Sequence, residues 1–156
     1  MKHRIAPVTL VIAFAIAFVL GIGLTVEAQE HRECSDASLN GSFGFTSTGT
    51  LLALPPPLAG PFGEIGRQTF DGRGNTDGTA TLSANGNILR VTFQGTYLMN
   101  SDCTGSMTLY VIPIGTTANF DFVIDDDGAE LRVIVAEAGA VETRVYKRQF
   151  SRGRKE

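Results

Sequence analysis

Few side chains in this sequence could do chemistry, and the carboxylate of Glu64 is foremost among them. In the segment GEIGRQ, Glu64 and Gln68 share a row with Phe62 by the two-residue period of a β-strand. If that row faces the inside of the fold, both polar groups must be hydrogen-bonded there or must bind a ligand. A bulge at the neighbouring glycines would instead turn Glu64 toward solvent. Glu64 is therefore a candidate ligand anchor and a candidate for proton transfer, with Gln68 as a second anchor.

Histidine and cysteine, the usual catalytic bases, nucleophiles and metal ligands, are scarce. The chain has two His and two Cys, and His31 precedes the first predicted strand. A serine nucleophile needs a positioned base, and a zinc site needs several His or Cys ligands. The sequence therefore predicts no metal and no cofactor, and it leaves open whether the protein is an enzyme.

The two cysteines lie far apart in the chain. Cys34 comes just before the first predicted strand, and Cys103 lies in the turn NSDCTG. In an oxidising compartment, an even number of cysteines favours disulfide pairing. Closing a loop of about seventy residues stabilises a fold by roughly 4 kcal/mol on loop-entropy grounds, and usually by less in practice. We predict a Cys34–Cys103 disulfide that ties the N-terminal segment, residues 29–41, to one end of the fold.

The first 28 residues resemble a secretory signal peptide. A basic start, MKHR, precedes an apolar run from Val8 to Leu24, and Val26-Glu27-Ala28 has the small-x-small pattern of a cleavage site. An uncleaved signal anchor is the alternative, because the apolar run approaches the length that crosses a bilayer. We expect cleavage near Ala28, no membrane span afterwards, and a secreted or periplasmic protein.

The charge of the chain argues against one class of partner. The formal net charge is −3, which does not favour nucleic acid. Basic residues do gather at the carboxyl end, where residues 151–156 are predicted to form a flexible tail. The sequence does not determine the oligomeric state.

The rest of the chain alternates apolar with polar residues in short runs between turns rich in Gly, Asn, Asp and Pro, which is typical of an all-β domain. The eight runs are residues 42–52, 62–70, 78–84, 87–98, 104–112, 118–125, 129–136 and 140–150. A meander of eight strands removes its exposed edges most simply by closing into an antiparallel up-and-down barrel. A two-sheet β-sandwich is the alternative. The predicted barrel domain spans residues 42–150.

The apolar row of each strand should face the interior of such a barrel. The predicted inward residues include Val141 and Val145 on the last strand. We expect a mostly apolar ligand cavity, capped by the proline-rich segment 54–58 and given space by Gly49, Gly66 and Gly95. The predicted ligand-binding residues are Phe45, Glu64, Gln68, Phe93, Tyr97 and Phe122.

Three stretches carry a resemblance. CSDASLNGSFGF, TFDGRGNTDGTATLSANG and GTYLMNSDCTGSMTL resemble a group of small secreted bacterial β-barrel proteins of unknown function. In architecture the chain is similar to calycin and allene oxide cyclase-type barrels, although it lacks the tryptophan usual in lipocalins. The resemblance implies a barrel that binds a small apolar or lipid-like ligand. It also leaves open a cyclase or isomerase, and a structural or interaction protein with a filled barrel.

Overall fold

The computed structural model describes residues 33–149, which form eight β-strands and two 3-10 helices. In chain order the elements are η1 (Asp36–Ser38), β1 (Asn40–Leu51), β2 (Gly60–Asp71), β3 (Asn75–Ala84), β4 (Asn87–Met99), β5 (Thr104–Ile112), β6 (Thr116–Asp125), η2 (Asp126–Gly128), β7 (Glu130–Val135) and β8 (Ala140–Arg148). The predicted signal peptide, residues 1–28, lies outside the described residues, as do His31 and the predicted tail, 151–156.

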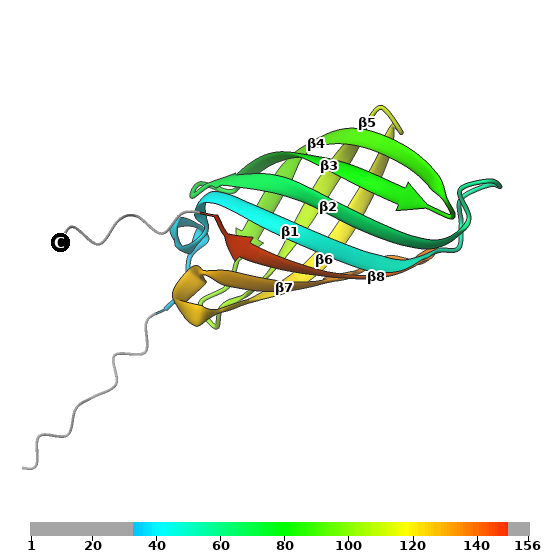
Figure 1. The fold of residues 1–156 in the computed structure, drawn as a ribbon. Helices are drawn as coiled ribbons and strands as arrows, with labels where there is room; N and C mark the ends of the chain where they lie inside the picture. Colours follow the sequence, from blue (N-terminus) through cyan, green and yellow to red (C-terminus); the bar gives the residue numbers. More distant parts are fainter. Residues whose placement is uncertain (1–32, 150–156) are drawn as a thin grey trace, which may run out of the picture. The chain divides into compact units, whose positions relative to one another are not determined.

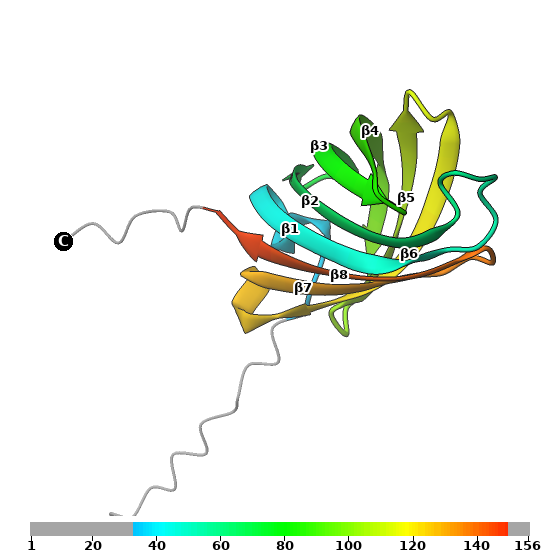
Figure 2. The ribbon, with the colours of Figure 1, turned by 45° about the vertical axis from the view of Figure 1, so that its right-hand side comes forward.

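The strands form one closed antiparallel barrel in sequence order. Each strand pairs with the next, and β1 also pairs with β8, so that β1 lies between β2 and β8 in Figures 1 and 2. Closure leaves no unpaired edge strand. The structure thus confirms the predicted up-and-down barrel over the sandwich.

The turns follow from local residue chemistry. Asn85 and Gly86 connect β3 to β4 with φ of 46° and 86°, the left-handed pair that a two-residue hairpin needs. Between β2 and β3, Asp71 Oδ1 accepts hydrogen bonds from the backbone N–H groups of Arg73 and Asn75, at 2.7 and 2.9 Å. The hydrogen bond from the Asn75 side chain has the largest effect on the Asp71 carboxyl and lowers its pKa. The two backbone hydrogen bonds lower this pKa further. Short-range contacts therefore fix both hairpins.

Residues alternate between the inside and the outside of the barrel, with one correction to the predicted rows. Val141 and Val145, predicted to face inward, are 62% and 39% exposed. On β8 the buried row is instead Glu142, Arg144 and Tyr146. The prediction for this strand was wrong because the apolar valines were assigned to the core, whereas the pairing of β8 with β1 places the polar row inside.

The N-terminal segment lies at the end of the barrel where β1 begins (Figure 1). Leu39 is completely buried, and the Tyr97 hydroxyl donates to the backbone oxygens of Asp36 and Leu39 at 3.0 and 2.9 Å. The predicted Cys34–Cys103 disulfide is confirmed, with its Cα atoms 5.0 Å apart. This end of the barrel is therefore plugged and covalently tied, and we call it the plugged end.

Aromatic rings fill the interior next to the plugged end. Phe70 lies edge-on to Phe43 and to Tyr97, at centroid distances of 5.5 and 5.2 Å. Deeper in, Phe45 stacks on Tyr146 at 4.8 Å and contacts Phe93 at 6.1 Å. We call this region the packed half.

The inward glycines do not supply the predicted space. A Cβ on Gly66 would lie 2.6 Å from the Phe45 ring, and one on Gly49 would lie 2.9 Å from the Phe62 ring. A Cβ on Gly95 would lie 1.9 Å from a backbone oxygen of the adjacent strand. The prediction that these glycines hollow the barrel was wrong, because aromatic rings and neighbouring backbone already occupy the space beside them.

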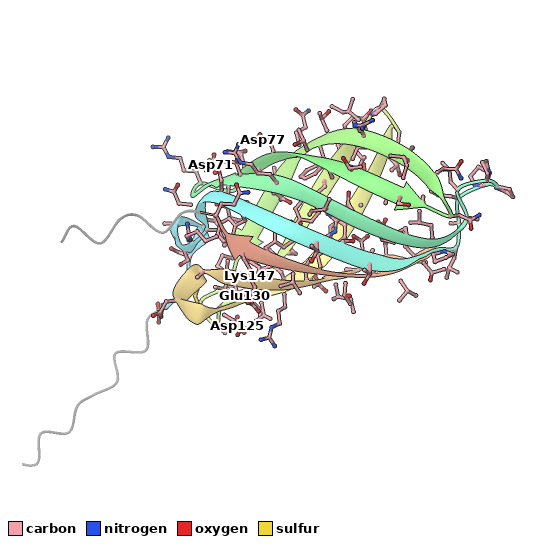
Figure 3. The ribbon with its side chains drawn as sticks, viewed as in Figure 1. Asp71, Asp77, Asp125, Glu130 and Lys147 are labelled. Carbon is pink, nitrogen blue, oxygen red and sulfur yellow. A yellow bond between two sulfur atoms is a disulfide. The ribbon has the colours of Figure 1, made fainter. Side chains whose placement is uncertain are left out.

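Most charges lie on the outside. Figure 3 shows Asp125, Glu130 and Lys147 together near the start of β7, and Lys147 Nζ lies 3.5 Å from Glu130 Oε2. Among residues 33–149, no helix is long and apolar enough to cross a membrane.

Candidate functional site

A cavity of about 270 Å³ opens at the end of the barrel opposite η1, which we call the open end. Its walls come from strands on all sides and are largely apolar. The apolar walls include Phe62, Leu82, Val91, Val111, Ala118 and Val135. Of these, Leu82, Val111, Ala118 and Val135 are only partly buried, although they point into the barrel. Their side chains are too short to meet across the interior, and this leaves the barrel hollow here.

Four charged side chains line the same cavity, and the three that are buried form its floor, which we call the acid–guanidinium floor: Glu64, Glu142 and Arg144. Arg144 Nη2 lies 3.5 Å from Glu64 Oε2, and Arg144 Nε donates to Glu142 Oε1. Their side chains are at most 9% exposed. Burying three charges costs free energy unless they are paired, and here each carboxylate faces the guanidinium.

Closure of the barrel brings these distant residues together. Ser47 on β1 pairs directly with Glu64 on β2 and, on its other side, with Arg144 on β8. All three residues therefore lie at one level of the barrel. Ser47 Oγ also donates to Glu142 Oε1 at 2.7 Å, so that Glu142 receives two hydrogen bonds. The continuous β1–β2 ladder has no bulge at Glu64, and the carboxylate points inward.

The guanidinium lies on aromatic rings of the packed half. Arg144 Cζ is 4.3 Å from the centroid of the Phe120 ring and 5.4 Å from that of Phe45. A cation over a ring face is attracted by the ring quadrupole, more strongly where water is excluded. Phe120 and Phe45 thus hold the underside of Arg144, while its edges contact the carboxylates.

A second polar network lies beneath the floor. The Tyr146 hydroxyl donates to Gln68 Oε1 at 2.9 Å, and Gln68 Nε2 donates to Thr76 Oγ1 at 2.9 Å. Arg144 Nη1 reaches the Tyr146 hydroxyl at 3.5 Å and joins this network to the floor. Among the described residues, no buried side-chain nitrogen or oxygen lacks a hydrogen-bond partner. Satisfied networks of this kind fix side-chain positions, and the floor is therefore preorganised.

Burial changes the acid–base properties of the floor. Desolvation raises the pKa of the Glu64 carboxyl, against the lowering effect of Arg144 and with a further rise from Glu142. Desolvation also raises the pKa of Tyr146 to about 12, so that Tyr146 remains a neutral hydroxyl near neutral pH. Burial at the floor therefore favours the protonated form of the Glu64 carboxyl.

The residues predicted to bind a ligand fall into two sets. Glu64 lines the cavity, whereas Gln68 lies beneath the floor with its amide bonded to Tyr146 and Thr76. The aromatic residues predicted to line the cavity belong to the packed core instead: Phe45, Phe93, Tyr97 and Phe122. They do not line the cavity because they lie at or below the level of the floor, where rings fill the barrel.

The predicted cap, residues 54–58, contributes only Leu54 to the cavity lining. Further along the segment, the backbone oxygen of Pro57 accepts hydrogen bonds from the side chains of Asn85 and Asn87, at 3.1 and 3.2 Å. These bonds attach the segment to the β3–β4 hairpin. It therefore forms one side of the open end.

Three residues of the site were not predicted from the sequence: Ser47, Glu142 and Arg144. The signal was present in AVETRVYKR, where Glu142, Arg144 and Tyr146 recur with a two-residue period. A row that ends in a large aromatic residue is as good a candidate for the inside of a barrel as a row of valines. No group of three or more His, Cys, Asp or Glu side chains suited to hold a metal ion occurs within residues 33–149.

Comparison with known proteins identifies the fold. No protein-family model and no curated protein matches the sequence. Among solved structures, the chain is similar to a redesigned beta barrel, with 15% identity and a TM-score of 0.54 over 74% of this chain and 95% of that one. It is also similar to EF1p2_mFAP2b bound to DFHBI, with 15% identity and a TM-score of 0.57 over 76% and 98% of the two chains. At this identity the likeness concerns the fold, a small β-barrel.

Proposed function

We propose that this protein binds a small, mostly apolar molecule in the cavity at the open end of its barrel. The observation that carries the proposal is the cavity itself, about 270 Å³ with apolar walls and a charged floor. Ligand sites are typically apolar concavities with a few fixed polar groups, and this volume lies just below the roughly 300–1,000 Å³ of drug-sized sites. The complex of EF1p2_mFAP2b with DFHBI, a small dye, supports the idea that a barrel of this fold can hold a small molecule.

The acid–guanidinium floor also supports binding. Apolar residues of similar volume commonly stabilise a core as well as a buried ion pair does, or better. The stability of the barrel therefore does not require charged residues at these positions, which are Glu64, Glu142 and Arg144. Their position at the base of a cavity suits groups that orient a ligand.

A neutral fluorescent probe tests the proposal. We expect N-phenyl-1-naphthylamine to bind the folded protein with increased fluorescence, and Ala118→Phe to abolish binding because the new ring fills the cavity from β6. Val123→Phe, on the outward face of β6, is the control and should bind the probe as the original protein does. Absence of probe binding, or equal binding by Ala118→Phe, would favour a structural or interaction role.

A secreted or periplasmic location completes the proposal. The Cys34–Cys103 disulfide supports an oxidising compartment. Residues 1–28 would act as the signal peptide. Mass spectrometry of exported protein tests this: a mature chain that begins at Gln29 supports it, and an intact Met1 in a membrane fraction contradicts it.

Proton transfer by Glu64 is a second candidate function, in line with a cyclase or isomerase. The observation that favours it is the raised pKa of a carboxyl that lines an apolar cavity. Eliminative ring opening of 5-nitrobenzisoxazole, which requires only a positioned base, tests whether Glu64 can act. Turnover that Glu64→Gln removes would support the enzyme. A rate equal to that in buffer would leave binding as the function.

A further inference from the structure

Negative side chains outnumber positive ones in the lining of the cavity. Three carboxylates, those of Glu64, Glu137 and Glu142, line it, against the single guanidinium of Arg144. Within the described residues, no Lys or His lines this cavity. Glu137 is exposed, so the buried part of this excess is the pair Glu64 and Glu142 against Arg144, in an apolar enclosure where charge interactions are stronger than in water.

Each of the three guanidinium nitrogens of Arg144 already has a partner in the protein. Its Nε is bonded to Glu142, its Nη2 faces Glu64, and its Nη1 reaches the Tyr146 hydroxyl. The ring of Phe120 covers one face of the guanidinium. A carboxylate or phosphate ligand would have to compete with Glu64 and Glu142 for the guanidinium and would be repelled by both carboxylates.

Of the two carboxylates of the floor, Glu64 is the less engaged in hydrogen bonds. Glu142 Oε1 already accepts from both Ser47 and Arg144. Glu64 has one contact, at 3.5 Å, between its Oε2 and Arg144. At the mouth of the cavity, the exposed Glu137 accepts from the backbone and side chain of Asn119, at 3.2 and 2.9 Å. A ligand donor entering past Glu137 would therefore reach Glu64 at the base.

From this arrangement we infer that the ligand carries a protonated nitrogen on a small apolar body, with the nitrogen on Glu64 and the body against Leu82, Val91 and Val111. The inference rests on the proposed binding function and specifies the chemical class of its ligand. A hydrogen bond in which the donor and the acceptor are charged is stronger than one between neutral groups. A cationic head should accordingly bind more tightly than a neutral head on the same chain.

Three probes with one alkyl chain and different heads test the inference by titration calorimetry near neutral pH: n-octylamine, 1-octanol and octanoate. We expect n-octylamine to bind about ten-fold or more tightly than 1-octanol, and octanoate to bind most weakly. In Glu64→Gln, n-octylamine should fall to the affinity of 1-octanol, which itself should hardly change. Glu130→Gln, outside the cavity near the plugged end, should leave all three affinities unchanged.

The possible results separate the two proposals. Octanoate binding as tightly as n-octylamine, or a preference for the amine that persists in Glu64→Gln, would overturn the cationic ligand and leave the binding function in place. If none of the three probes binds, the binding function fails and this inference fails with it. Thermal unfolding of Glu64→Gln, together with its retained affinity for 1-octanol, checks that the variant keeps its fold and its cavity.

Discussion

At the plugged end of the barrel, aromatic rings meet across the interior, whereas at the open end the inward side chains stop short of one another. Phe43, Phe70 and Tyr97 contact edge to face at centroid distances of 5.2 to 5.5 Å. At the other end, Val111 and Val135 face a cavity of about 270 Å³. Both ends have the same strand pairing and the same alternation, so the volume of the inward residues decides which end is filled.

The two ends also differ in what their polar side chains contact. Near the plugged end, the Tyr97 hydroxyl and the Asp36 carboxylate bond to backbone groups and hold the N-terminal segment in place. At the floor of the open end, Glu64 and Arg144 contact other side chains and face the cavity. Polar groups hold a chain segment in the first region, and in the second they line a cavity.

The largest expected effect on stability comes from removing one phenylalanine side chain at a time, first from the packed half and then from the open end. Phe70→Ala, in the packed half, should lower the free energy of unfolding by about 3–5 kcal/mol, because it opens a void among close-packed rings. Phe62→Ala, on the wall of the existing cavity, should cost about half as much, since its site already borders open space. Urea unfolding followed by circular dichroism measures both. Equal losses would mean that the open end is as tightly packed as the plugged end.

Loss of the disulfide should have the next largest effect on stability. It should leave the cavity intact, because the bond lies at the plugged end. The Cys34→Ser, Cys103→Ser double variant should be less stable by about 2–4 kcal/mol, because the bond closes a loop with a sequence separation of 69 residues. Binding of N-phenyl-1-naphthylamine should persist at temperatures where the variant is folded, since the cavity lies at the opposite end. A folded variant that no longer binds the probe would show that the two ends are coupled.

Much of this architecture was predictable from the sequence. Alternation and turn residues predicted the eight strands to within about three residues at each end, and the arrangement as a closed barrel. The shared face with Phe62 and Phe70 made an inward Glu64 one of two possibilities, and a bulge that turns it to solvent was the other; the continuous β1–β2 ladder decides for the first. The disulfide followed from the number of cysteines and the predicted compartment.

The floor and the true position of the cavity were not predictable in the same way. Glu64 and Arg144 meet only because β1 pairs with both β2 and β8, and the sequence gives no measure of that register. Which end is hollow depends on side chains of different strands that come to lie at one level. Phe45 and Phe93 could therefore be assigned to the interior but not to its packed half.

Larger side chains at the two ends provide the converse test of the same difference in packing. Ala80→Phe, at a buried position of the core, should cost about 1–3 kcal/mol because the ring has no space to occupy. Ala118→Phe should cost less than about 1 kcal/mol, since its ring enters the cavity. Thermal unfolding of the two variants measures the difference. A larger loss for Ala118→Phe would mean that the open end cannot accept volume.

The smallest expected effect is the response of stability to pH through Glu64. Its carboxyl faces Arg144 and Glu142 at the floor, with Glu137 at the mouth, and burial raises its pKa above 4.5. A raised pKa in the folded protein means that folding favours the protonated form, so the contribution of Glu64 is complete below pH 4.5 and is lost as the pH rises through the raised value. The stability of Glu64→Gln relative to the original protein should therefore increase from pH 4.5 toward neutrality.

Asp71 and Asp102, whose pKa values are lowered from 3.8, change stability at lower pH and are common to both proteins. Urea unfolding across this pH range measures the difference, and a difference that does not change with pH would show that the floor keeps Glu64 as easily ionised as a carboxyl in water.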